Sequence, residues 1–289
     1  MLLPCRLRLR LPGRPAADPR AARVGHDGAM TDLLLVAGLS LAVAVLVMTV
    51  TALAAARAGR VSVVDVAWGI ALVAVALVCA VLAGTWQSWL LLVLVAVWGG
   101  RLSAHIFTTS RGHGEDPRYE ALLGGTLDRV GMGRAVRKVF LVQGAAVWLV
   151  SLPLQAAALA GVDWTGAIWV GVAVWLVGVL FEAVGDAQLG AYRRDPDRGP
   201  VLDRGLWSWT RHPNYFGDAC VWWGIWLAGG VASGWVAGLA SVLSPVAMTI
   251  WLVWITGARL LERTMMQRPG YPEYAARTSM FVPLPPKRS

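Results

Sequence analysis

The chain has 289 residues, of which 57% are hydrophobic and only 15% are charged. A soluble domain carries about 25% charged residues, so this composition excludes an ordinary soluble protein and points to an integral membrane protein. Sixteen tryptophans stand against five phenylalanines and five tyrosines, and many lie near the ends of apolar runs, at the headgroup level that indole rings prefer. The net charge of +9 is spread over several loops, which favours anionic headgroups or an anionic cofactor over nucleic acid as the partner.

The three cysteines, Cys5, Cys79 and Cys220, form no CxxC pair. We therefore expect neither a disulfide framework nor a cysteine metal site. Four histidines, two of them in one loop and helix end, do not make a zinc site either. No bound metal is predicted.

Residues 1–29 are rich in Arg, Pro and Ala and lack the apolar region of a signal peptide. One interpretation is a disordered extension. The other, which we prefer, is a misassigned start, with Met30 as the true first residue.

Seven long apolar runs follow, each close to the ~20 residues that cross a hydrocarbon core of ~30 Å. They cover approximately residues 33–56, 64–83, 86–107, 139–160, 166–189, 215–232 and 235–258. Their Gly and Ala content suits close packing between helices, and little more than Gly84-Thr85 separates the second run from the third. The expected fold of residues 30–289 is an all-α, polytopic membrane bundle of about seven transmembrane helices, with a tight hairpin between the second and third.

Basic residues lie almost entirely on one side of this topology. Segments 57–63, 110–138, 190–213 and 259–289 hold nineteen Lys and Arg residues, whereas the loops on the other side hold none. By the positive-inside rule the basic side, with the C-terminal segment 259–289, faces the cytoplasm of a cell inner (plasma) membrane. The six Arg of residues 1–29 would then lie on the wrong side, which is our reason for preferring Met30.

Polar residues inside the spans are costly in lipid and so are candidates for function. Trp98, Arg101 and His105 share one face of the third span, because they are three and four residues apart. Arg101 either snorkels to the interface or belongs to a site.

Asp65, one turn inside the second span, needs a partner, and Arg101 is the candidate. Alternatively, Ser62 and Asp65 form a helix cap resembling a capping box, which is compatible with a site. We expect the loop from Gly114 to Glu120 to be an ordinary solvated loop.

The fifth span ends in a polar stripe, because Glu182, Asp186 and Arg193 recur every three to seven residues on one helix face. Carboxylates there suit ribose hydroxyl or amide donors, and Arg193 or Arg194 suits phosphate. The alternative is a buried salt-bridge stripe without a ligand.

The densest polar cluster lies in the segment that runs from Gly205 to Asp218 and leads into an apolar run. It contains Arg211, His212, Asn214, Tyr215 and Asp218. Pro213 disfavours helix at the preceding residue, so the sixth span is expected to begin at or after it. That start places Asn214 and Tyr215 at a helix N-terminus, which suits an anion. No GxGxxG turn follows a strand, so no Rossmann domain is expected.

Several motifs together resemble the DUF1295 family: the SVVDVAW, WGGRLSAH, GEDPRY and GLWSWTRHPNYFGD segments and the tail LLERTMMQRPGYPEYAARTSMFVP. The resemblance covers essentially residues 30–289. It implies a relation to steroid 5-alpha-reductases, membrane enzymes that reduce an enone with NADPH. It also implies a fold like theirs.

The resemblance implies a cofactor site made of ten residues. Glu182 and Asp186 match an Asn and an Asp four apart, Arg193 matches a phosphate-facing Arg, Asn214 and Asp218 match an Asn and a Glu, and Arg259 matches an Arg ending the last span. Arg211, His212 and Tyr215 lie in the same segment, and Glu262 follows Arg259. The family's catalytic Tyr corresponds to Trp98 here, and its Gln-Glu pair is reduced to Asp65.

The expected function is NADPH-dependent reduction of a conjugated C=C bond in an apolar, lipid-soluble substrate, steroid-like or isoprenoid, taken from the bilayer. Asp65, Trp98, Arg101 and His105 form the expected catalytic group. Protonated Asp65, His105 or a nearby Tyr would hydrogen-bond the developing oxyanion. No protein partner is expected.

Two other functions stay open. Isoprenylcysteine carboxyl methyltransferases, which use S-adenosylmethionine, carry a similar Arg-His-Pro-x-Tyr segment and a Glu near the end of the last span, like Glu262. A non-enzymatic lipid-binding protein on the same frame is the third possibility, because fold does not imply function.

Overall fold

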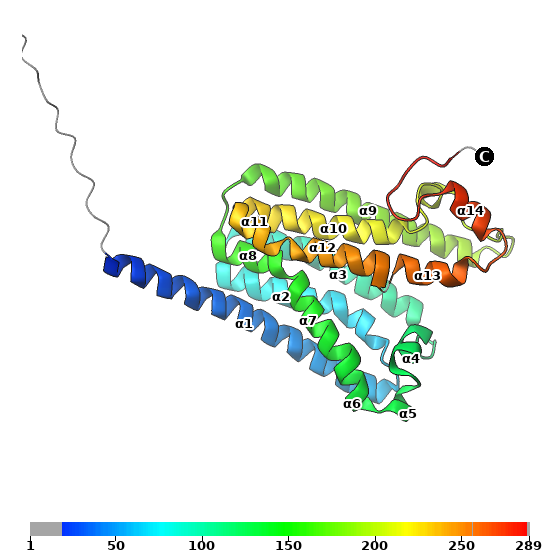
Figure 1. Cartoon of the computed structure of the whole chain (residues 1–289), viewed down its shortest axis with the longest axis horizontal. Helices are drawn as coiled ribbons and strands as arrows, with labels where there is room; N and C mark the ends of the chain where they lie inside the picture. Colours follow the sequence, from blue (N-terminus) through cyan, green and yellow to red (C-terminus); the bar gives the residue numbers. More distant parts are fainter. Residues whose placement is uncertain (1–18, 256, 288–289) are drawn as a thin grey trace, which may run out of the picture.

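The structure is a computed structural model that describes residues 19–255 and 257–287. Within these residues the only non-helical pairing is a single bridge between Thr210 and Ser279, which confirms the all-α prediction (Figure 1). Most of the expected N-terminal extension, residues 1–18, lies outside the described residues. Helix α1 already begins at Pro19, upstream of residue 30.

The helices follow one another with few long connections. Their bounds are α1 (Pro19–Ala58), α2 (Val63–Ala83), α3 (Trp86–Ser110), α4 (Pro117–Leu123), α5 (Leu127–Val130), α6 (Met132–Ala135), the π-helix η1 (Val136–Phe140), α7 (Leu141–Val150), α8 (Leu152–Ala160), α9 (Thr165–Arg194), the 3₁₀ turn η2 (Gly205–Ser208), α10 (Pro213–Gly229), the 3₁₀ turn η3 (Val231–Ser233), α11 (Trp235–Ser241), α12 (Leu243–Ile250), the π-helix η4 (Trp251–Ile255), α13 (Ala258–Met265) and α14 (Tyr271–Arg277).

Five helical segments in the described chain are long and apolar enough to cross a membrane: Gly28–Ala58, Val63–Ala83, Trp86–Ser110, Thr165–Arg194 and Trp235–Met265. A sixth results if the pair Met132–Val150 and Leu152–Ala160, bent by 40°, is one span. The bend lies at Pro153, in the first turn of α8, where proline has no N–H to donate. The predicted sixth run is α10, whose 17 residues are at the short end of a span.

The outer faces of these helices are apolar and exposed, as a protein surrounded by lipid requires. Leu34, Leu46, Val81, Leu180 and Leu239 each expose 60% or more of their surface. In water such surfaces would aggregate. The chain is therefore a multi-pass helical membrane protein.

The hairpin predicted between the second and third spans is present. Gly84 ends α2 in the left-handed conformation, with a φ of 64°, and its N–H donates to Ala80 O. Thr85 then begins α3, and its hydroxyl oxygen accepts from Ser88 N at 3.3 Å. Two residues thus reverse the chain because a glycine and an N-cap residue stand side by side.

Glycines repeat every seven residues where α9 packs on α10. A Cβ added to Gly178 would lie 2.6 Å from the Gly217 carbonyl oxygen, and one added to Gly171 would lie 2.6 Å from that of Gly224. Gly185 continues the row against Pro213. The two backbones approach this closely because no side chain stands between them, and the contact places the end of α9 against the start of α10.

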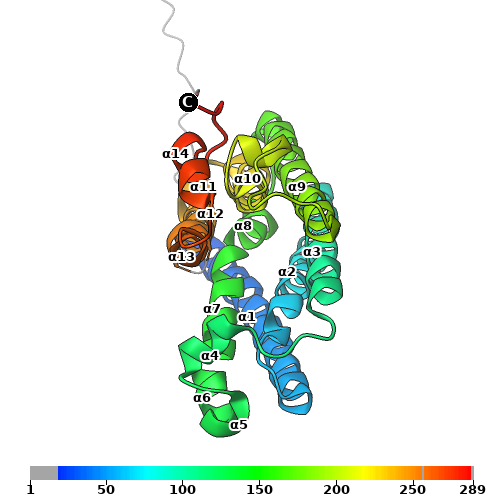
Figure 2. The same cartoon turned by 90° about the vertical axis from the view of Figure 1, so that its right-hand side faces the viewer.

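The basic loops gather at one end of the bundle, which we call the basic end (right in Figure 1). It holds the C-terminal ends of α3, α9 and α13, together with α4 and α14. Figure 2 looks onto this end, where α10 lies between α9 and α12. The α2–α3 turn, α8 and α11 lie at the opposite end.

Candidate functional site

Arg101, on α3, forms ion pairs with two carboxylates of α9. Its guanidinium contacts Glu182, and its Nη1 donates to Asp186 Oδ2 at 3.0 Å. Glu182 and Asp186 are four residues apart and therefore share one face of α9. The Arg101 side chain is only 22% exposed, so it belongs to a site between helices and does not snorkel to the interface.

Two further side chains converge on Asp186. His105 lies one turn beyond Arg101, with its Nε2 3.8 Å from Asp186 Oδ2. Asn214, in the first turn of α10, donates from Nδ2 to Asp186 Oδ1 at 3.4 Å. The predicted face of α3 and the predicted stripe of α9 therefore meet the start of α10 in one place.

Asp218 is buried one turn further along α10, and its charge interacts with those of Glu182, Arg101 and Asp186. We call Arg101, His105, Glu182, Asp186, Asn214 and Asp218 the α3–α9–α10 cluster.

Buried polar atoms of both kinds lack hydrogen-bond partners within the described part of this cluster: the donor Arg101 Nε and two carboxylate oxygens. Glu182 is 3% exposed and Asp218 8% exposed, yet Glu182 Oε2 and Asp218 Oδ1 have no hydrogen-bond partner among the described residues. A buried polar atom without a partner is costly and rare in proteins. Donors from a bound molecule, such as hydroxyl or amide groups, would satisfy both oxygens.

Trp98 lies fully buried between α3 and α10. Its ring meets that of Trp222 edge to face, with centroids 5.3 Å apart. It packs against the cluster, and its indole N–H lies near the Asp218 carboxylate.

The predicted pairing of Asp65 with Arg101 is wrong. Asp65 instead accepts a hydrogen bond from the Tyr119 hydroxyl, and Arg118 Nη2 lies 3.5 Å from its other oxygen. Both partners belong to α4, which follows the third span. Asp65 and Arg101 point to different neighbours although α2 and α3 are adjacent.

The solvated-loop prediction for Gly114–Glu120 is also wrong. Glu115 accepts hydrogen bonds from the backbone N–H groups of Val61 and Ser62, at the start of α2. Ser62 itself makes no capping hydrogen bond, so the cap expected from Ser62 and Asp65 is supplied by Glu115 from another segment. Asp116 caps α4 by accepting from Arg118 N at 2.8 Å.

The electrostatics of this loop keep the Tyr119 phenol neutral and the Asp116 carboxylate charged. Burial, and then the Asp65 charge, raise the pKa of Tyr119 well above its usual range. Burial also acts to raise the pKa of Asp116, but hydrogen bonds from Arg118 outweigh it and lower that pKa below its ordinary value. Tyr119 is therefore a hydrogen-bond donor at neutral pH.

Tyr215 connects the two groups of residues. Its phenol is close enough to Arg118 and Asp65, and to Asp218 and Asp186, to feel the charges of both groups. The loop after the third span and the α3–α9–α10 cluster thus form one continuous polar region at the basic end.

Arg211 and Glu262 form a separate contact. Arg211 Nε and Nη2 donate to the two Glu262 oxygens at 2.5 and 2.7 Å, and Nη1 donates to the carbonyls of Ala275 and Thr278 at 2.8 and 2.6 Å. Tyr271 also donates to Glu262, at 3.2 Å. Arg211 therefore fastens the C-terminal segment to the loop before α10, and its donors are occupied.

His212 completes this contact. Its Nε2 lies 3.2 Å from Glu262 Oε1, and its ring stacks on that of Tyr215 with centroids 5.5 Å apart. It is the N-cap residue of α10, with φ −137° and ψ 62°, so the predicted helix start at Pro213 is confirmed. We call Arg211, His212, Glu262 and Tyr271 the tail clamp.

The two remaining predicted residues lie on the surface. Arg193, near the end of α9, is exposed. The arginine that pairs with the α9 carboxylates is Arg101 of α3. Arg259 is also exposed, with its guanidinium 5.6 Å from the centroid of the Trp254 ring.

Sequence reasoning missed Arg118 and Tyr119, the two α4 residues that contact Asp65. The signal was the density of polar residues in GEDPRY next to a span, together with an Asp65 that lacked a nearby partner. No group of three or more His, Cys, Asp or Glu side chains in the described chain could hold a metal ion.

Comparison with known proteins gives one match. No curated protein and no solved structure matches the chain. A family model described as "Protein of unknown function (DUF1295)" matches residues 51–278, more than half of the chain. These residues include both the α3–α9–α10 cluster and the tail clamp. The protein is a member of the DUF1295 family.

Proposed function

We propose that the protein is an NADPH-dependent reductase of a conjugated C=C bond in a lipid-soluble substrate, steroid-like or isoprenoid. The observation that carries the proposal is the α3–α9–α10 cluster, in which two buried carboxylate oxygens lack donors. Unsatisfied acceptors of this kind at the basic end suit a polar ligand that brings hydroxyl and amide donors together with negative charge.

The residues present fit such a cofactor. Glu182 and Asp218 would accept from ribose hydroxyls or the carboxamide, and Asn214 can both donate and accept. The exposed Arg193 at the end of α9 would meet phosphate, and the N-terminus of α10 favours negative charge. Arg211, Glu262 and Arg259 drop out of this cofactor set, because the first two are paired with each other and the third lies beside Trp254.

When bound, NADPH supplies the hydride for the β-carbon of the enone. The chain's own part is to stabilise the negative charge that develops on the carbonyl oxygen. Tyr119, which stays protonated, is the donor that we assign to this task; its single O–H would turn from Asp65 to the substrate oxygen. Arg118 lies beside Tyr119 and would keep its ion pair with Asp65. The packed rings of Trp98 and Trp222 would exclude water from the buried side of the cluster.

The proposed setting is the inner (plasma) membrane with the basic end in the cytoplasm, where NADPH is present. The substrate reaches the cluster sideways from the bilayer, through the apolar faces of the spans.

A thermal-shift comparison in detergent tests the cofactor. A ligand that binds only the folded form stabilises it, so NADPH is expected to raise the melting temperature and S-adenosylmethionine to leave it unchanged. The Asp218→Asn variant tests the site and should show a smaller NADPH shift at the same cofactor concentration. Loss of NADPH absorbance on addition of enones then tests the reaction. No NADPH shift in wild-type protein would sink the proposal.

The methyltransferase remains as a rival, because Arg211, His212 and Glu262 do lie together. The tail clamp, however, leaves Glu262 bound to three protein side chains. A shift with S-adenosylmethionine alone would select that rival, and no shift with either cofactor would favour the non-enzymatic, lipid-binding alternative.

A further inference from the structure

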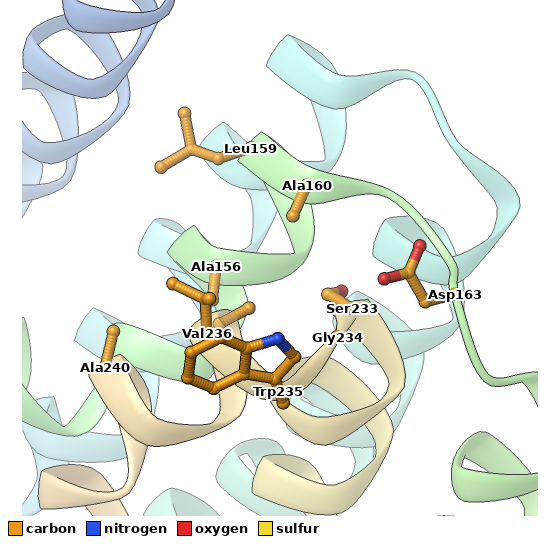
Figure 3. A pocket seen from close by; sticks show the side chains of 10 residues that line it. Ala156, Leu159, Ala160, Asp163, Ser233, Gly234, Trp235, Val236 and Ala240 are labelled. Carbon is orange, nitrogen blue, oxygen red and sulfur yellow. The ribbon is translucent and has the colours of Figure 1, made fainter.

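A groove lies between α8 and α11 at the end of the bundle opposite the α3–α9–α10 cluster. Its volume is about 340 Å³. Figure 3 shows Ala156 and Leu159 of α8 on one side and Val236 and Ala240 of α11 on the other, with the Asp163 carboxylate at one end. The groove is thus apolar along its length and acidic at its end.

The acidic end lies at the level of lipid headgroups. Trp164 and Trp235 flank it and expose 51% and 67% of their surfaces, and Trp86 on the adjacent hairpin exposes 51%. Exposed tryptophans at the ends of spanning helices mark the membrane interface. The apolar part of the groove therefore extends from this interface toward the hydrocarbon.

The Asp163 carboxylate is exposed and lacks a side-chain partner in the described part of the chain. No described side chain forms a hydrogen bond or ion pair with it, although its backbone N–H is fixed by a 2.8 Å hydrogen bond to Ala232 O. Its Oδ2 lies over Gly234, where a Cβ would come within 2.5 Å. Gly234 has a φ of +100°, a backbone conformation that favours glycine.

The charges around the groove determine which lipid headgroup it favours. The loops at this end, residues 84–85, 161–164 and 230–234, contain no basic residue, and Asp163 is their only charge. An anionic headgroup would be repelled, whereas a primary ammonium could pair with the carboxylate and donate hydrogen bonds to it.

We propose that this groove binds one acyl chain of a phospholipid whose aminoethyl headgroup pairs with Asp163. The site is independent of the proposed cofactor cluster, which lies at the other end of the bundle. Chain burial supplies the binding energy, and the ion pair supplies the preference among headgroups.

Native mass spectrometry of the purified full chain, given an equimolar mixture of phosphatidylethanolamine and phosphatidylglycerol with identical chains, tests the site. Wild-type protein is expected to retain about two- to fivefold more of the ethanolamine lipid, the range that an exposed ion pair provides. Asp163→Asn should bring the ratio to about one without removing lipid. Ala240→Trp should fill the groove and remove the preferentially bound lipid.

Leu239→Trp is the matched control for Ala240→Trp. It adds the same ring to the neighbouring residue of α11, which is exposed and does not line the groove, so the lipid ratio should stay as in wild type. An unchanged ratio in Asp163→Asn, equal retention of both lipids by wild type, or full retention by Ala240→Trp would each overturn the proposal. None of these results depends on NADPH, so a failure here leaves the proposed reductase untouched.

Discussion

The segment from Arg211 to Asp218 contributes to two regions that differ in whether their charged groups have hydrogen-bond partners. In the tail clamp, Arg211 makes four hydrogen bonds and Glu262 has three side-chain partners. In the α3–α9–α10 cluster, Asp218 Oδ1, seven residues after Arg211, and Glu182 Oε2, on α9, have no hydrogen-bond partner among the described residues.

The difference separates a structural role from a binding role. Groups that are fully satisfied hold the fold together, and removing one leaves the others buried and unpaired. Groups that lack partners cost stability until a ligand supplies them. Adjacent residues of one motif can therefore have different roles. Variants of these residues distinguish a structural role from a binding role.

The largest effect is expected from Arg211→Gln. It leaves Glu262 partly buried without its cation and frees two tail carbonyls, at a cost of about 3–5 kcal/mol in the free energy of unfolding. Thermal or denaturant unfolding in detergent measures it. The double variant Arg211→Gln, Glu262→Gln should be more stable than the single one, since the orphaned charge is gone. If Arg211→Gln were as stable as wild type, the tail clamp would not stabilise the fold.

Gly178→Ala is expected to cost about 1–3 kcal/mol, because its Cβ would meet the Gly217 carbonyl oxygen and force α9 away from α10. It should also weaken NADPH binding, since Asp186 would move away from Asn214. Gly166→Ala is the control on the same helix, where nothing lies within 4 Å. Equal stability of the two variants would show that close packing does not hold this pair.

Asp218→Asn is expected to leave stability unchanged or slightly raised, because it removes a buried charge without a hydrogen-bonded partner on Oδ1. In the same variant the affinity for NADPH should fall by about tenfold or more, the effect of losing a charge-assisted hydrogen bond. Calorimetric titration and thermal unfolding on one preparation give both values. A large loss of stability would place Asp218 with the tail clamp instead.

The smallest effect is expected at Asp116. Asp116→Ala removes the cap of α4 and costs about 1 kcal/mol, while Asp116→Asn keeps the cap and loses only the ion pair with Arg118, costing less. The pKa of Asp116 is lowered on folding, so its stabilisation is complete above its unfolded value of 3.8 and is lost as the pH falls through the folded value. The stability gap between wild type and Asp116→Asn should therefore close at acid pH, and a gap that widened would contradict this assignment.

The features that could be predicted from the sequence are those that depend on residues close together in the chain. The α2–α3 hairpin follows from Gly84-Thr85, and the start of α10 follows from Pro213. The shared faces of Arg101 with His105 and of Glu182 with Asp186 follow from helical spacing. Each of these features depends on residues within two turns of one another.

Pairings between distant segments were not foreseeable in this way. Asp65 and Tyr119 are 54 residues apart, and Arg211 and Glu262 are 51 apart. Which partner a polar group meets depends on the rotation and tilt of whole helices, and hydrophobic patterning fixes these only loosely. Helical spacing therefore places Arg101 on the right face of α3 but does not identify Glu182 and Asp186 as its partners.

The glycine row between α9 and α10 also bears on movement. The two helices touch backbone to backbone along their length, so they form one rigid wall of the cluster. Gly69 and Gly99 fasten α2 to α3 in the same manner, with a Cβ on Gly69 only 2.5 Å from the Gly99 carbonyl oxygen. At the basic end Arg101 and His105 of α3 face the carboxylates of α9 through side-chain ion pairs, which a charged ligand can replace with its own. We therefore expect any opening of the cluster to move α2 and α3 together against the α9–α10 pair and to break the ion pairs of Arg101.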